Sequence, residues 1–192
     1  MESAAFITSP SPLVTRTIEC TVARFGPGAL ALAADAGIRI VALESGGAYR
    51  DASAALRRLG AGVDEWPAPP AGLFVVEERT MYLRTCSPMT IAHEFGHALD
   101  CALGGGVYRS TTDCAIRSAF AAATAFVTPY AASAVDEYFA EAMRAWVGVN
   151  DVRSLWPRAT RERLRTLDPT IADILAELFA GELAVRDREP RT

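Results

Sequence analysis

The stretch His93-Glu94-Phe95-Gly96-His97 says more about the fold and chemistry of this 192-residue chain than any other, and it holds both of the chain's histidines. Residues four apart on an α-helix lie on one face, one turn from each other, where two imidazoles can bind a single metal ion. Glu94 would then stand beside the metal and could take a proton from a metal-bound water. The pentapeptide therefore predicts a helix that carries a metal site.

The surrounding residues indicate that the pentapeptide lies in the middle of this helix. Ser87-Pro88 is typical of an N-cap followed by proline at the first helical position. The residues that follow are compatible with a buried helix: Met89, Thr90, Ile91, Ala92, Phe95, Ala98 and Leu99. Gly104-Gly105-Gly106 would end the helix. The sequence favours the HExxH arrangement of zinc hydrolases over a solvent-facing helix with incidental histidines.

A catalytic zinc ion usually takes three protein ligands and keeps one position for water, so a further ligand is required. Cys101 is excluded because it lies eight residues after His93, about 12 Å along the helix axis, whereas zinc bonds are about 2.0–2.3 Å long. Asp100 is excluded as a ligand for the same reason. It could instead accept a hydrogen bond from a ligand histidine, or be a solvated residue near the helix end.

The segment Ala134–Trp146 is the best source of the third ligand, since it reads as a helix that is apolar on most of its circumference. Ser133 and Asp136 resemble a capping box at its start. Glu137 and Glu141 are four residues apart and share a face. Carboxylates on such a helix are costly to bury unless they are paired or metal-bound, which favours a metal-site role for Glu137. The alternatives are a solvated face, or a Glu141 that pairs with an arginine.

Together, the segments His93–Asp100 and Glu137–Met143, with Tyr130 between them, resemble the catalytic domain of the anthrax toxin lethal factor family. These proteins are gluzincin metallopeptidases, and the bacterial Pro-Pro endopeptidases belong to the same group. The resemblance covers roughly residues 70–180. It implies a zincin-like metallopeptidase fold and one zinc ion per chain.

The same resemblance implies a role for each residue that matches it. Zinc would be held by His93, His97 and Glu137, and Glu94 would be the general base. Tyr130, seven residues before Glu137, would act in catalysis, and Glu141 would be a carboxylate close behind the metal ligands. Independently of the family, a phenol near zinc can hydrogen-bond a developing oxyanion. The alternative for Tyr130 is a structural residue at a turn between helices, after Pro129.

Elsewhere, hydrophobic patterning and turn residues predict helices over 13–25, 29–36, 52–59, 113–126 and 170–181, and strands over 38–43, 72–76 and 80–84. We expect an α+β fold with a small mixed sheet, an active-site helix and a helical C-terminal half. Residues 1–12 read as a flexible leader, 13–183 as a single catalytic domain and 184–192 as a frayed charged tail. The hairpin over 72–84 leads into the motif helix. Its strand could pair with an extended peptide substrate, or the sheet could bind no ligand.

Bulk properties narrow the function classes further. The net charge is −4 with no basic stripe, which argues against nucleic acid as a partner. No apolar run reaches the roughly 18–20 residues of a membrane helix. The first residues do not form a signal peptide, so a cytoplasmic protein is the default, with export by a non-classical route as the alternative. Four cysteines without a CxxC pair are expected to be free, buried thiols.

We therefore expect a zinc-dependent metallo-endopeptidase that acts on a peptide or protein, as a monomer by default. One alternative is a zinc hydrolase whose substrate is a non-protein amide or a biosynthetic-pathway compound. Another is a non-catalytic interaction module with a zincin fold, although such a module would not need Glu94 as a base.

Overall fold

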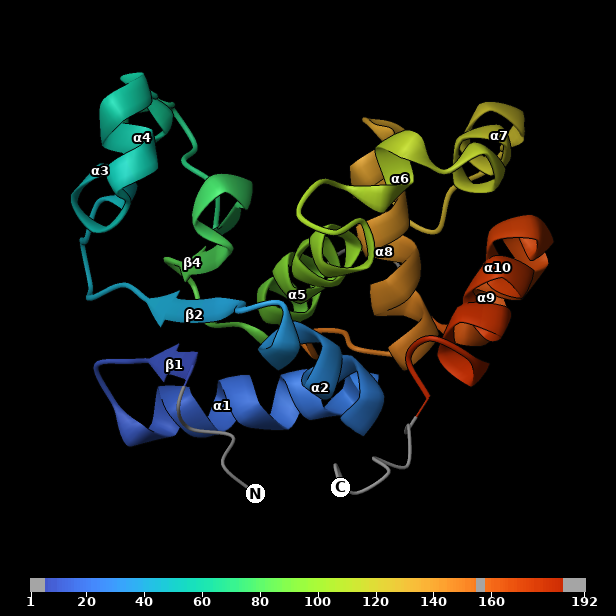
Figure 1. The fold of residues 1–192 in the computed structure, drawn as a ribbon, viewed down its shortest axis with the longest axis horizontal. Helices are drawn as coiled ribbons and strands as arrows, with labels where there is room; N and C mark the ends of the chain where they lie inside the picture. The colour runs from blue at the N-terminus through green and yellow to red at the C-terminus, as the bar shows by residue number, and fades with distance from the viewer. Residues whose placement is uncertain (1–5, 155–157, 185–192) are drawn as a thin grey trace, which may run out of the picture.

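The structure, a computed structural model, describes residues 6–154 and 158–184 (Figure 1). The strands are β1 (Ile7–Thr8), β2 (Arg39–Ala42), β3 (Gly72–Val75) and β4 (Thr80–Leu83). The α-helices are α1 (Pro12–Val22), α2 (Pro27–Asp35), α3 (Tyr49–Ala52), α4 (Ala54–Leu59), α5 (Pro88–Leu103), α6 (Arg109–Thr112), α7 (Cys114–Ala122), α8 (Val135–Val147), α9 (Arg161–Leu167) and α10 (Pro169–Ala180). Short 3-10 helices are η2 (Ala23–Phe25), η3 (Val63–Glu65), η4 (Val76–Glu78) and η5 (Tyr130–Ala132).

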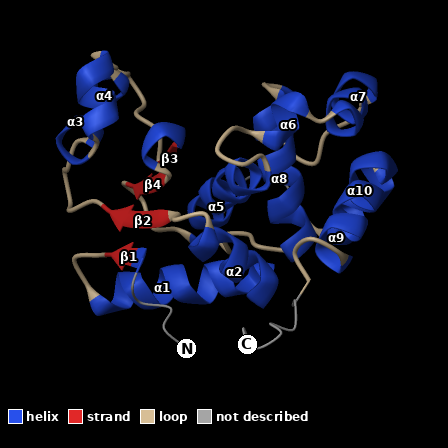
Figure 2. Ribbon diagram, in the orientation of Figure 1, coloured by secondary structure: helices blue, strands red, loops and turns tan. Residues whose placement is uncertain are grey.

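The four strands form one mixed sheet in the order β1-β2-β4-β3. β1 and β2 are parallel, as are β2 and β4, whereas β3 pairs antiparallel with β4 through the turn at η4. β3 therefore lies at an edge, and α5 packs on both β3 and β4. Figure 2 shows the strands between α1 and α2 on one side and α3 and α4 on the other.

The central strand β4 is buried on both faces of the sheet. Its successive side chains point to opposite faces and so enter two different clusters. Met81 and Leu83 of β4 belong to the main core, which the helices α1, α2, α5 and α8 also build. Tyr82, between them, packs instead into a smaller cluster with Tyr49 and Leu56 of the α3–α4 segment. The main core continues from the sheet through α5 into the helical C-terminal half (Figure 1).

Most expected elements are present, with shifts that local capping explains. The helix expected over 52–59 corresponds to α4 and begins two residues later, at Ala54, because Ser53 is extended and its hydroxyl caps α4 at Leu56 N, 3.1 Å away. Ala52 instead ends the preceding helix α3. The helix expected over 113–126 ends earlier, at Ala122. The helices α6 and α9 were not expected. Each is short and polar, and α9 buries only Leu164.

Two of the expected domain boundaries fall near residues that the structure does not describe. Residues 1–5 of the expected leader lie outside the described part, but Ile7–Thr8 forms β1, paired with Ile40 and Val41. The sheet thus begins within the segment expected to be flexible, since a two-residue strand has no alternation to recognise. The expected tail lies outside the described residues apart from Ala184.

Two expectations from composition can be compared with the described residues. No described helix is long and apolar enough to cross a membrane. All the cysteines are free, as expected, but only Cys101 is buried; Cys20 and Cys114 are exposed and Cys86 is intermediate.

Candidate metal centre

The helix α5 carries the pentapeptide as the sequence predicts. Ser87 is extended and its hydroxyl accepts a hydrogen bond from Thr90 N at 3.2 Å, while Pro88 occupies the first turn. The helix ends at Gly104. His93 and His97 lie one turn apart and are buried, with exposed fractions of 8% and 5%.

The helix α8 crosses α5 closely enough to bring Glu137 to the two histidines. A Cβ atom at Gly96 would lie 3.0 Å from Ala140 Cα and 3.1 Å from Ala140 O, so a side chain there would push the helices apart. The predicted capping box at the start of α8 is wrong: Ala134 is the N-cap and makes no side-chain capping bond. The Ser133 hydroxyl donates instead to the Tyr130 carbonyl at 2.7 Å.

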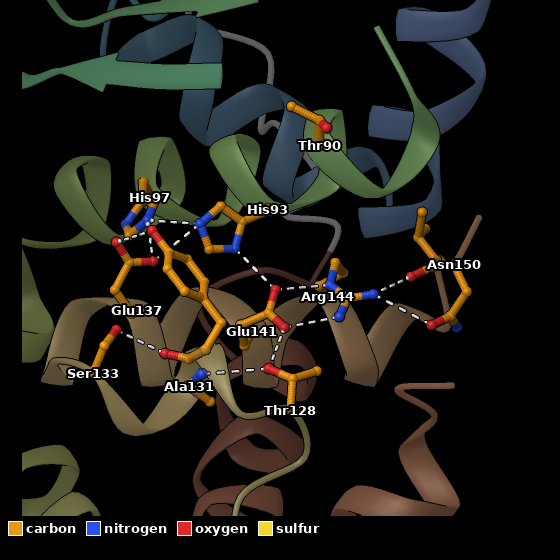
Figure 3. A network of polar contacts seen from close by, with 12 residues as sticks. Thr90, His93, His97, Thr128, Ala131, Ser133, Glu137, Glu141, Arg144 and Asn150 are labelled. Atoms are coloured by element: carbon orange, nitrogen blue, oxygen red, sulfur yellow. Dashed lines mark hydrogen bonds and ion pairs between the residues drawn. The ribbon is translucent and has the colours of Figure 1, made fainter. Parts of the chain in front are cut away.

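Three ligand atoms converge on one point between these helices (Figure 3). Glu137 Oε2 lies 3.0 Å from His93 Nε2 and 3.2 Å from His97 Nε2, and the two Nε2 atoms are 3.2 Å apart. A tetrahedral ion with bonds of about 2.0–2.1 Å sets its ligand atoms about 3.3 Å apart. The spacing and the chemistry of the donor set therefore fit one divalent metal ion.

Glu141 supports the site from behind through four hydrogen bonds. Its Oε1 lies 2.9 Å from His93 Nδ1, and Thr128 Oγ1 donates to its Oε2 at 2.6 Å. Arg144 Nε and Nη2 donate to the two oxygens at 2.8 Å each. Two of the interpretations of Glu141 thus hold together: it contacts a candidate metal ligand, and it pairs with an arginine (Figure 3).

The charges of the site favour a cation. Burial opposes charge on His93, but its hydrogen bonds with Glu137 and Glu141 raise its pKa to about 10. Burial would raise the pKa values of Glu137 and Glu141. Hydrogen bonds from His93 and His97 nevertheless hold the pKa of Glu137 well below its usual range, and hydrogen bonds from His93 and Arg144 do the same for Glu141. The carboxylates of Glu137 and Glu141 thus favour a positive charge at this point, and a metal ion bound there would displace the proton.

Glu94 is buried beside the histidines, with an exposed fraction of 6%. Burial raises its pKa, and the nearby His93 and His97 partly oppose that effect. The backbone of β3 lies directly against it: a Cβ at Gly72 would lie 2.5 Å from Glu94 Cγ and 2.9 Å from Glu94 Oε1. Gly72 thus leaves the space that this carboxylate fills. In the sequence, a glycine at the start of a predicted strand is the only feature that marks this role.

Tyr130 is located beside the same site, in η5 directly after Pro129. Its hydroxyl donates to Glu137 Oε1 at 3.0 Å, and its ring centroid is 5.4 Å from that of His93. The side chain is 44% exposed, so the phenol is open to solvent on one side. Tyr130 is therefore both a turn residue and a neighbour of the candidate ligands.

Asp100 differs from both of its interpretations. It is fully buried rather than solvated, and its oxygens accept from Ser110 N at 2.8 Å and Ser110 Oγ at 2.5 Å, not from a histidine. Burial raises its pKa to about 6, although the hydrogen bonds from Ser110 work against the rise. This partner could not be predicted from the sequence, because Ser110 is ten residues after Asp100 and the chain folds back to it only through the turn at Gly104–Gly106.

A second tyrosine, which sequence reasoning missed, flanks the site. The ring of Tyr108 lies 5.5 Å from the ring of His97 and 6.4 Å from that of Phe74 in β3. Nothing in the sequence around Tyr108, two residues after Gly106, indicates that its ring packs on a candidate metal ligand.

Comparison with known proteins supports the fold. No protein-family model matches the sequence, and no curated protein matches it. The structure is similar to that of the Pro-Pro endopeptidase PPEP-2 from Paenibacillus alvei, with a TM-score of 0.65 and 18% sequence identity, over 92% of this chain and 99% of that one. At this identity the likeness shows the fold alone. The expected mixed sheet and helical C-terminal half are confirmed, and the relation to the lethal factor family stays a prediction.

Proposed function

We propose that this protein is a zinc-dependent metallo-endopeptidase in which His93, His97 and Glu137 hold one zinc ion and Glu94 is the general base. The carrying observation is the convergence of two imidazole nitrogens and one carboxylate oxygen within 3.0–3.2 Å, with the buried Glu94 beside them. Two histidines and a glutamate are a ligand set of zinc peptidases. The fold neighbour PPEP-2 is a Pro-Pro endopeptidase, which supports the same class of reaction.

Each residue has a defined task in this mechanism. Bound zinc would supply Lewis-acid chemistry and lower the pKa of an attacking water to about 7. Glu94 takes the proton of that water as it attacks the peptide carbonyl, then passes the proton to the leaving amine. Burial raises the pKa of Glu94, which makes it a stronger base for this step. Tyr130 donates a hydrogen bond to the developing oxyanion, in place of its bond to Glu137.

The position of β3 favours an extended peptide over a small amide as the substrate. β3 is an edge strand, and no described strand pairs with its outer side. Its residue Gly72 touches Glu94, so a peptide added along this edge would pass the base. Such strand addition binds the substrate through backbone hydrogen bonds and leaves selectivity to the side-chain pockets.

The test compares the wild type with Glu137→Ala and Glu94→Gln for zinc content and for cleavage. We expect about one zinc ion per chain in the wild type by elemental mass spectrometry, because a catalytic site of three protein ligands holds one. Glu137→Ala should retain much less. Glu94→Gln should keep its zinc but lose cleavage by a factor of about 100 or more, since it removes the proton acceptor alone.

The substrates for this comparison are a peptide library that includes Pro-Pro bonds, beside a set of small amides. Equal zinc content in the wild type and Glu137→Ala would remove Glu137 from the ligand set. Cleavage by Glu94→Gln at the wild-type rate would remove Glu94 from its role. A wild type without zinc, even after metal is added, would overturn the proposed function.

A further inference from the structure

The two histidines of the candidate metal centre are held in different ways. His93 Nδ1 is bonded to Glu141 Oε1 at 2.9 Å. His97 Nδ1 is buried, yet it has no hydrogen-bond partner among the described residues. Metal-binding histidines almost always donate from their second nitrogen to an oxygen, and this bond fixes the orientation of the ring. The ring of His97 must therefore be oriented by packing.

Tyr108 provides this packing. Its ring centroid lies 5.5 Å from that of His97 at an interplanar angle of 40°, within the range of attractive ring contacts. Phe74 of β3 supports Tyr108 from another side at 6.4 Å. The ring of Tyr108 thus occupies the space between the edge strand and a candidate metal ligand.

The segment before Tyr108 is folded tightly back onto α5. A Cβ at Gly104 would lie 2.0 Å from Val107 O, so only glycine permits the chain to return here. The carbonyl of Tyr108 then accepts from Thr111 N at 3.2 Å and from Thr111 Oγ1 at 2.7 Å. These bonds fix the backbone on which the ring is mounted.

Asp100 and Ser110 fasten the same segment to the helix that carries His97. Both are fully buried, and Ser110 gives its N–H and its hydroxyl to the two oxygens of Asp100 at 2.8 and 2.5 Å. A buried carboxylate is costly unless it accepts hydrogen bonds. Here the donor of both bonds is one serine, two residues after Tyr108. This arrangement fixes the position of the loop.

We propose that Asp100 and Ser110 form a latch that holds Tyr108 against His97, and that Tyr108 sets the orientation of this metal ligand in place of a hydrogen bond. All three are positioning residues that act through His97. The inference rests on the metal site of the proposed function, but not on its substrate.

The test measures the zinc affinity of the purified protein by competition with a chelator and records the absorption spectrum of the cobalt-substituted form. Tyr108→Leu should weaken zinc binding on the order of 10-fold, as loss of a supporting residue does at other metal sites, and should alter the cobalt spectrum. Tyr108→Phe keeps the ring, so its zinc affinity and its cobalt spectrum should match those of the wild type. Ser110→Ala, which loses one bond of the latch, should give a smaller change in the same direction.

Phe179→Leu is the matched control. Phe179 is also half-buried and, among the described residues, packs its ring on Trp146 at 6.0 Å. It belongs to α10 and contacts none of the candidate ligands through its ring. It should leave zinc affinity unchanged even if it lowers the melting temperature, which is measured on the metal-free form of each variant. Where Tyr108→Leu does not fold, Ser110→Ala against Phe179→Leu makes the same comparison.

The outcomes separate this proposal from the proposed function. Wild-type zinc affinity and an unchanged cobalt spectrum in Tyr108→Leu, or in Ser110→Ala where that variant stands in for it, would overturn the latch alone. If Tyr108→Leu binds zinc more weakly but the wild type cleaves no peptide, the latch is supported and the proposed peptidase activity is overturned. A wild type that binds neither zinc nor cobalt would overturn both.

Discussion

Glu141 joins the candidate metal centre to the core through one carboxylate. On one side it is hydrogen-bonded to His93 Nδ1. On the other side it accepts hydrogen bonds from Arg144, which is only 1% exposed. Glu141→Gln would leave the Arg144 charge buried without a counter-ion, which costs about 3–5 kcal/mol. We expect the free energy of unfolding, measured in urea, to fall by about that amount.

The double variant Glu141→Gln/Arg144→Met is the control, because removing both charges should recover much of the loss. The effect also has a predicted pH dependence. Since the folded-state pKa of Glu141 is lowered, its stabilising contribution is complete above the unfolded value of about 4.3. It is lost progressively as the pH falls from that value through the lower folded-state pKa. A single variant as stable as the wild type at pH 7 would contradict this account.

Tyr130 tests whether a half-exposed phenol takes part in the reaction. Tyr130→Phe keeps the ring against His93 and removes only the hydroxyl that bonds Glu137. We expect kcat to fall about 100-fold, as for the loss of one oxyanion donor, with zinc content unchanged by elemental mass spectrometry. A rate equal to that of the wild type would leave Tyr130 as a turn residue.

Sequence reasoning brought together the candidate residues whose relations are local. His93 and His97 lie one turn apart on one helix, with Glu94 next to His93, and Glu137 and Glu141 lie one turn apart on another, so periodicity placed each pair on a common face. Gly72 and Tyr108 escaped notice because their contacts with Glu94 and His97 depend on tertiary packing. The partner of Asp100 was missed for the same reason, since the chain returns to α5 only after three glycines.

At the scale of elements, the contact between β3 and α5 determines where Glu94 lies. Gly72→Ala would place a methyl group 2.5 Å from Glu94 Cγ, and this overpacking costs about 1–3 kcal/mol unless the carboxylate moves. We expect cleavage to fall at least about 10-fold, since a shift of this order in a positioned group is costly, while zinc is retained.

Gly62→Ala is the matched control for that variant. A Cβ there comes no closer than 3.5 Å to any atom, the end of the Glu65 side chain, and the residue has an ordinary negative φ. It should cleave and unfold like the wild type. If Gly72→Ala behaves in the same way, the space at β3 is not what positions Glu94.

Elements could be predicted where they carry their own end signals. α5 begins at Ser87-Pro88 and α10 at Asp168-Pro169, where a capping side chain precedes proline. β1 and α6 are too short for any periodicity, and only their partners in the fold define them. At the start of α8 the sequence misled, because Ser133 turned back to Tyr130 instead of capping the helix.

At the scale of the whole molecule, the candidate ligands come from two parts of the chain. α5 packs on the sheet and on α1 and α2, while α8 packs on α5, α7, α9 and α10. An ion held by His93, His97 and Glu137 would therefore tie the sheet-bearing half to the helical half (Figure 1). A tie of this kind stabilises the folded state, because the unfolded chain does not hold the three ligands together.

Removal of the metal should accordingly lower the stability of the entire fold. With free zinc at 100 times its Kd, binding adds about 2.7 kcal/mol to the free energy of unfolding, which a thermal scan with and without a chelator would detect as a shift in Tm. Glu137→Ala should lose most of this shift, whereas Glu94→Gln, which removes no ligand, should keep it.

The shift in Tm should become smaller as the pH falls. In the metal-free protein the pKa of His93 is raised to about 10. Below that pH a proton competes with zinc for His93, and the competition becomes stronger as the proton concentration rises. Equal melting temperatures with and without zinc, at a zinc concentration that fills the site, would show that the two halves hold together without the ion.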